Sequence, residues 1–181
     1  EKPEKEQFQV VNKTTLTVRA ECCLWFAWAP LDFEGPEPHK EGEASRPVWV
    51  GLLPETTHVS VSVTSEGEWQ HGGQAIEKTD AHGRTDAEGT KSLGDLRYQS
   101  DYRASLVADT PARLNCLMVI AGNESGPIFP NEAIPVGLGG TIAIGDVGVE
   151  GRLLFFGMHD AYQWNNNKGI MEVEVEERRI I

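Results

Sequence analysis

A strict alternation of apolar and acidic residues in the last part of the chain constrains its fold most. In residues 170–178 the apolar positions and the acidic positions interleave: Met171, Val173 and Val175 with Glu172, Glu174 and Glu176. A period of two is typical of a β-strand with one face buried and the other in water. Residues 151–158 form another apolar run shortly before it. We therefore expect the two runs to be neighbouring strands joined by a polar loop, the second of which closes a sheet.

Short apolar runs separated by Gly and Pro recur from residue 48 onward. The candidate strands are residues 48–53, 59–63, 104–108, 113–120, 133–136, 141–144, 151–158 and 170–178. No stretch keeps apolar residues at helical spacing for three turns. This pattern predicts an all-β fold, an antiparallel β-sandwich or jelly roll, rather than a parallel α/β sheet. Residues 70–102 show no clear strand and are expected to form long loops, which are often functional.

The first 46 residues are expected to form an N-terminal extension with extra strands and a linker, ahead of a β-sandwich domain over residues 47–181. Residues 8–11 and 15–25 predict two strands joined by a hairpin turn at Asn12-Lys13. The extension either adds strands to the sandwich or joins a preceding domain. The aromatic segment 24–30 offers Trp25 and Trp28 as a stacking platform for a sugar ring, or contributes to a core or interface.

The charge and hydropathy of the chain exclude several classes of partner. A net charge of −12 argues against nucleic acid, because phosphate binding depends on Lys and Arg. No apolar run approaches the length needed to span a bilayer, and we expect no signal peptide within these residues. The start at Glu1 fits either a mature terminus or an artificial boundary.

The three cysteines allow at most one intramolecular disulfide. Cys22 and Cys23 are adjacent in a predicted strand and point to opposite faces, so they suit a single metal poorly. Cys116 shares a parity with apolar neighbours and is expected to be buried, although a bridge to Cys22 or Cys23 stays open.

The loop between the last two apolar runs concentrates oxygen ligands. It contains Asp160, three consecutive amides at residues 165–167, and Gly169. Carboxylate and amide oxygens are the ligands that calcium prefers. The same residues also form ordinary hairpin turns, since Asn and Gly tolerate positive φ. The loop alone therefore leaves a calcium site and a plain turn as alternatives.

The pattern Asp160, Trp164, Asn166-Asn167 and Gly169, running into an alternating strand, resembles small calcium-dependent galactose-binding lectins of the LecA (PA-I) type. The spacer after Asp160 is one residue shorter than in that family. Residues 117–130 and 134–137 match the family's glycine-punctuated strand pair, and residues 59–69, ending in Gly-x-Trp, match more loosely. The similarity covers roughly residues 47–178 and implies a galactose-binding-domain-like sandwich in an extracellular or periplasmic protein.

The resemblance also implies a set of calcium ligands. Asp160, Asn166 and Asn167 would supply side-chain oxygens, while Gln163 and Gly72 would supply backbone carbonyls. Two positions on the Ca²⁺ ion would then be left for two adjacent hydroxyls of a galactoside or other glycan. A single carboxylate in this set implies modest calcium affinity.

The same resemblance assigns the sugar contacts. The unused oxygens of Asp160, Asn166 and Asn167 would accept the hydroxyl protons, and Asp80 and His82 are the nearest candidates for an outer hydroxyl. The loop containing them is longer than in the lectins and lacks their His-Pro-x-x-Gln run. Weak single-site binding of this kind is usually strengthened by multivalency, through a homo-oligomer or a larger multidomain protein.

Two other classes of function compete with a lectin. A hydrolase would draw on the histidines and aspartates of the chain: His58, His71, His82, His159, Asp80, Asp86 and Asp160. No nucleophile elbow, HExxH or phosphate-binding loop accompanies them, so we expect no enzyme. A structural or assembly module that keeps the sandwich without a sugar site is the second alternative.

Overall fold

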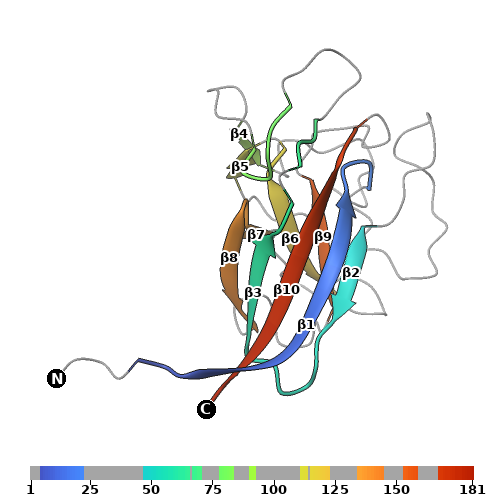
Figure 1. Ribbon diagram of the computed structural model, residues 1–181. Coiled ribbons are helices and arrows are strands. Elements are labelled where there is room, and N and C mark those ends of the chain that lie inside the picture. Colours follow the sequence, from blue (N-terminus) through green and yellow to red (C-terminus); the bar gives the residue numbers. More distant parts are fainter. Residues whose placement is uncertain are drawn as a thin grey trace.

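The apolar runs form strands of two four-stranded antiparallel sheets (Figure 1). The computed structural model describes residues 5–22, 47–65, 67–70, 78–83, 90–92, 111–113, 115–122, 134–144, 153–158 and 167–181. The first sheet has the order β1 (Phe8–Arg19), β10 (Ile170–Ile180), β3 (His58–Val63), β8 (Gly139–Ala143). The second has the order β2 (Val48–Gly51), β9 (Leu153–Met158), β6 (Leu117–Gly122), β7 (Ile134–Pro135). A short pair, β4 (Thr90–Ser92) and β5 (Pro111–Arg113), stands apart from both.

One hydrophobic core lies between the two sheets, as in a β-sandwich. The first sheet contributes Val18, Val61 and Val173, and the second contributes Val119 and Phe156. The prediction of an all-β fold with antiparallel sheets is confirmed, and the described residues include no helix.

Strand β10 shows the alternation that the sequence predicts. Met171, Val173 and Val175 are fully buried, whereas the glutamates between them are only partly covered. The strand does not pair with β9, however, which lies in the other sheet. The prediction that the last two runs are neighbouring strands is wrong, because each buries its apolar face against the core from an opposite sheet. Strand β10 instead lies between β1 and β3.

Strands β6 and β9 read as continuous apolar runs because both of their faces are covered. Ile120 and Phe155 are fully buried although they lie outside the main core cluster, and Cys116 is buried as predicted. The predicted strand 113–120 is interrupted at Asn115, whose φ of 68° ends one strand before the next begins. The predicted strand at residues 104–108 lies outside the described residues, while β4 arises where no strand was expected.

Strand β1 is continuous, so the predicted hairpin turn at Asn12-Lys13 is wrong. The strand pairs with β10 from Phe8 to Arg19, and the register shifts between Val10 and Asn12 as in a β-bulge. Leu16 and Val18 then enter the core. The N-terminal extension thus contributes a strand to the first sheet, held along its whole length by β10.

The bulge places Asn12 opposite a buried carboxylate, Glu177, which is completely shielded from solvent. Its Oε2 accepts a hydrogen bond from Asn12 Nδ2, and its Oε1 accepts bonds from Leu53 N and Thr56 Oγ1, each 2.7 Å long. Leu53 follows β2 of the second sheet, and Thr56 precedes β3 of the first. Glu177 therefore joins β1, β10 and the connection between the two sheets.

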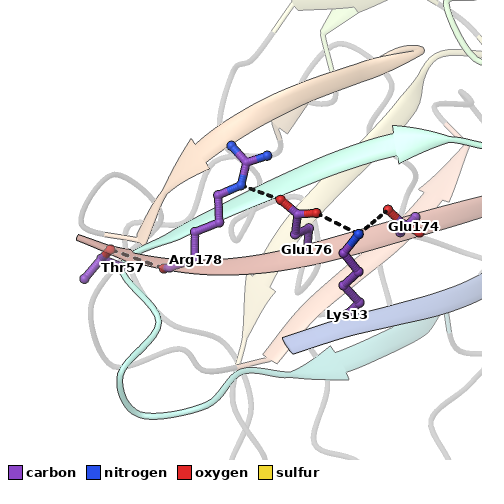
Figure 2. A network of polar contacts seen from close by, with 5 residues as sticks. All are labelled: Lys13, Thr57, Glu174, Glu176 and Arg178. Carbon is purple, nitrogen blue, oxygen red and sulfur yellow. Dashed lines mark hydrogen bonds and ion pairs between the residues drawn. The ribbon is translucent and has the colours of Figure 1, made fainter. Parts of the chain in front are cut away.

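The outer face of the first sheet carries an ionic network (Figure 2). Glu176 accepts from Arg178 Nε at 2.6 Å and lies 3.1 Å from Lys13 Nζ, which is 3.8 Å from Glu174. The bonds from Arg178 and Lys13 hold the pKa of Glu176 below its ordinary value, and Glu176 raises the pKa of Lys13. The network fastens β1 to β10 on the solvent side.

Candidate functional site

Short backbone pairings organise the end of the sandwich at which β10 begins. Gln70 and Lys168 exchange two backbone hydrogen bonds, of 2.9 and 3.0 Å, and Trp69 and Thr79 exchange two of 2.9 Å. The segment around residues 69–70 is thus flanked by the chain before β10 on one side and by residues 78–79 on the other. The three segments form a small antiparallel ladder.

Trp69 anchors this ladder. Its side chain is 1% exposed, and its indole Nε1 donates a 2.6 Å hydrogen bond to the carbonyl oxygen of Asn115. A buried Trp needs such an acceptor for its ring N–H. The Gly-x-Trp motif therefore ends in a residue that fixes residues 69–70 against the start of β6.

Both the backbone conformation at position 169 and the lack of space for a side chain there require glycine. Its φ is 110°, in the region that favours glycine, and a Cβ there would lie 2.6 Å from Trp69 Cβ and 2.7 Å from the carbonyl oxygen of Glu68. No side chain fits without moving backbone. The glycine at the end of the oxygen-rich loop is thus the point where the chain passes directly over Trp69.

Asn167 lies within the described residues, and its side chain is buried. Its Nδ2 donates a 3.0 Å bond to the carbonyl oxygen of Ala20, and Ala20 N donates to the carbonyl oxygen of Gly169 at 3.0 Å. These bonds tie the end of β1 to the start of β10.

The donor set predicted around Asn167 fits calcium in its chemistry, since it combines one carboxylate, two amide oxygens and two backbone carbonyls. The other four predicted ligands, Asp160, Gln163, Asn166 and Gly72, lie outside the described residues. In the part of the chain that the structure describes, no group of three His, Cys, Asp or Glu residues is arranged to hold a metal ion. The predicted aromatic residues Trp25, Trp28 and Trp164 also fall outside that part.

Asp80 and His82, the predicted contacts for an outer hydroxyl, occupy a turn directly after the Trp69–Thr79 pair. Asp80 Oδ1 accepts a 2.8 Å bond from His82 N, and Gly83 closes the turn with a φ of 90°. Both side chains are exposed. The structure thus brings these two residues to the same end of the molecule as Asn167.

A shallow hollow of about 330 Å³ lies beside this turn. Its lining combines the apolar Val63, Ala81, Leu138 and Met171 with Ser65, Gly67, Glu68 and Asp80. Leu138 is half exposed. A lining of apolar residues with a few polar ones is usual for a small-molecule site.

A second, smaller notch adjoins the hollow at Glu68. It is lined by Glu68, Trp69, Gln70, Lys78, Lys168 and Gly169. Sequence analysis singled out neither lysine, because they are ninety residues apart and only the pairing of Gln70 with Lys168 and of Trp69 with Thr79 brings them to one place. Each of the two predicted loops contains one of these lysines, which was the only available sequence signal.

Cys22 is buried, and burial raises the pKa of its thiol to about 11. A thiol of this kind stays protonated at neutral pH and does not act as a nucleophile. Cys22 and Cys116 are not bonded to each other.

No family model, curated protein or solved structure matches the chain. Among the described residues there is no helix long and apolar enough to cross a membrane.

Proposed function

We propose that this protein is a calcium-dependent carbohydrate-binding module of the galactose-binding lectin type, built on a jelly-roll sandwich, without catalytic activity. Asp160, Asn166 and Asn167 would hold Ca²⁺ through side-chain oxygens, and Gln163 and Gly72 through backbone carbonyls. The bound ion would coordinate two adjacent hydroxyls of a glycan. The protein would act in an extracellular or periplasmic setting.

The observation that carries this proposal is the double backbone hydrogen bond between Gln70 and Lys168. Gly72 follows Gln70 by two residues, and Asn166 precedes Lys168 by two. The predicted ligands Gly72 and Asn166 are more than ninety residues apart in the sequence. Each lies two residues from one member of this backbone pair. Such pairing would help to bring ligands from the two loops within reach of one Ca²⁺ ion.

A rigid base further supports the proposal, because a binding site must be held in its productive geometry before the ligand arrives. Trp69 is bonded to Asn115, Gly169 packs on Trp69, and Asn167 is bonded to Ala20. The hollow beside Asp80 offers room for a sugar ring, whose hydroxyls would find acceptors in Asp80 and Glu68, two of the residues that line it.

One observation favours the second candidate, a structural or assembly module without a sugar site. Packing alone accounts for both described residues of the signature, since Gly169 leaves no space for a side chain above Trp69 and Asn167 ties β1 to β10. A sandwich could keep the two residues for stability after losing its ligand.

Thermal unfolding with calcium and with a chelator separates the two candidates. A ligand at 100 times its Kd stabilises the folded state by about 2.7 kcal/mol, which for a chain of this size raises Tm by roughly 5–10 °C. Asn166→Ala should abolish the rise, whereas the matched control Asn165→Ala should keep it. Asn167→Ala is a poor probe because it also removes the bond to Ala20.

A glycan array, run with calcium and with a chelator, completes the test. Calcium-dependent binding of galactosides that Asn166→Ala removes is the expected result. Binding that survives the chelator would overturn the metal-bridged mechanism. No calcium-induced rise in Tm together with a silent array would leave the structural module as the better account.

A further inference from the structure

Three polar residues form a row across the small ladder at the base of the predicted loops. Gln70 and Lys168 are a directly opposed antiparallel pair, so their side chains share a face. The Trp69–Thr79 pair sets the register on the other side and places Lys78 opposite Gln70. Lys78 and Lys168 therefore flank Gln70 on one face, with backbones about 10 Å apart, two strand spacings. The shared notch that these three side chains line agrees with this register. We call Lys78, Gln70 and Lys168 the basic row.

Neither ammonium group of the basic row is neutralised by the part of the chain that the structure describes. The ion pairs there involve Lys13, Arg19 and Arg178. Glu68 borders the notch but makes no ion pair with Lys78 or Lys168. Within the described residues, Lys78 and Lys168 are thus two exposed lysines that line one notch without an ion pair, in a chain with 28 acidic and 16 basic residues.

The row lies on a fixed platform. Trp69 is buried and bonded to Asn115, and Gly169 next to Lys168 is locked above Trp69. Only the flexible ends of the two lysines are left to order when a ligand binds, which lowers the entropic cost of using them. The two ammonium groups and the Gln70 amide all supply hydrogen-bond donors, so the row suits a compact anionic group.

The basic row also adjoins the proposed glycan site in the sequence. Lys168 follows Asn166 by two residues, and Gln70 precedes Gly72 by two. We propose that the basic row binds the carboxylate or sulfate group of an acidic saccharide whose hydroxyls occupy the neighbouring calcium site. This inference rests on the proposed function and specifies its ligand class. A polyanion such as nucleic acid is a poor ligand, because two lysines stand against a net charge of −12.

The test compares matched saccharides, one neutral and one that differs only by a uronic acid or a sulfate group. Binding is measured by calorimetry in the presence of calcium, for the wild type, Lys78→Gln, Lys168→Gln, the double variant and the control Lys5→Gln. Lys5 is exposed and lies outside the ladder. We expect the wild type to bind the acidic member about five- to tenfold more tightly, and this preference to shrink as NaCl rises from about 0.05 M to about 0.5 M.

Each single variant should lose part of the preference and the double variant nearly all of it, while Lys5→Gln keeps it and every variant binds the neutral saccharide like the wild type. Equal, calcium-dependent binding of both saccharides by the wild type would overturn this inference and leave the proposed function standing. A preference that the double variant retains would also overturn it. If neither saccharide binds, the proposed function fails, and the inference about the basic row fails with it.

Discussion

Glu177 is the buried residue that joins β1 and β10 to the connection between the two sheets. It occupies an inward position of β10, where the three preceding inward residues are apolar, and it accepts hydrogen bonds from Asn12, Leu53 and Thr56. A buried polar acceptor is tolerable when several donors satisfy it. Here donors from β1 and from the connection between the sheets meet one acceptor.

Glu177→Gln should lower the free energy of unfolding by about 1–3 kcal/mol, because the new amide NH₂ faces groups that are themselves donors. Urea unfolding at neutral pH measures the change. Glu174→Gln, a partly exposed substitution on the same strand, is the control and should stay within about 0.5 kcal/mol. Equal effects of the two substitutions would contradict the role of Glu177.

Gly169→Ala tests the close passage of the chain over Trp69. A methyl group there meets backbone at less than 3 Å and adopts an unfavourable φ of 110°, so we expect a loss of about 2–4 kcal/mol. Gly51→Ala is the matched control, since its added methyl group would meet only Leu153 Cδ2, at an ordinary 3.6 Å. A near-neutral Gly169→Ala would show that the segment around Trp69 can relax.

Strands β1 and β10 show what the sequence could and could not predict. The alternation in β10 identified its buried face correctly, because a period of two has no other simple explanation. The misassigned turn at Asn12-Lys13 has a physical cause: residues that favour turns also suit a β-bulge, and the partner Glu177 is 165 residues away.

Contacts between residues far apart in the sequence could not be predicted either. Partners in a sheet cannot be inferred from local pattern, so the assignment of β9 and β10 to different sheets required the structure. In the predicted site, Gly169 was recognised for its conformational freedom, but its packing against Trp69 and the bond from Asn167 to Ala20 are contacts over about 100 and 147 residues. The basic row was missed for the same reason.

The ionic network between β1 and β10 should make stability depend on pH in a defined window. The pKa of Glu176 is lowered from 4.5, so its contribution is present above that value and is lost as the pH falls through the lowered pKa. The pKa of Lys13 is raised from 10.5, so its contribution is present below that value and is lost as the pH rises through the raised pKa.

Glu176→Gln keeps the side-chain shape and removes the charge, so we expect a Tm lower by roughly 1–2 °C at neutral pH, as befits a solvent-screened pair. The difference from the wild type should shrink and then vanish as the pH falls through the lowered pKa of Glu176, because the wild-type carboxyl loses its charge there. Differential scanning fluorimetry across this range measures it. A difference that persists unchanged at low pH would assign the effect to shape rather than charge.

At the scale of the whole molecule, the first sheet is built from both ends of the chain. Strand β1 pairs with β10 along its length, and Leu16 and Val18 complete the core that β3 and β10 begin. The domain boundary expected at residue 47 therefore divides the first sheet: β1 lies before it in the sequence, and β3, β8 and β10 lie after it.

Residues 47–181 alone should lose cooperative unfolding, because β10 would expose one edge and the core would lack the side chains of β1. Near-ultraviolet circular dichroism and thermal unfolding would report the loss. A synthetic peptide of residues 5–22 added in excess should restore a cooperative transition by mass action. A fragment that unfolds cooperatively without the peptide would show that β1 is dispensable.

The central place of β10 between β1 and β3 has a consequence for biosynthesis. A ribosome delivers β1 early, and β3 some forty residues later, yet neither can gain its shared neighbour until residues 170–180 emerge from the exit tunnel. Such long-range closure is slow, and it leaves two strand edges unprotected meanwhile. Translation of this chain should thus benefit from a holding chaperone until β10 takes its place between β1 and β3.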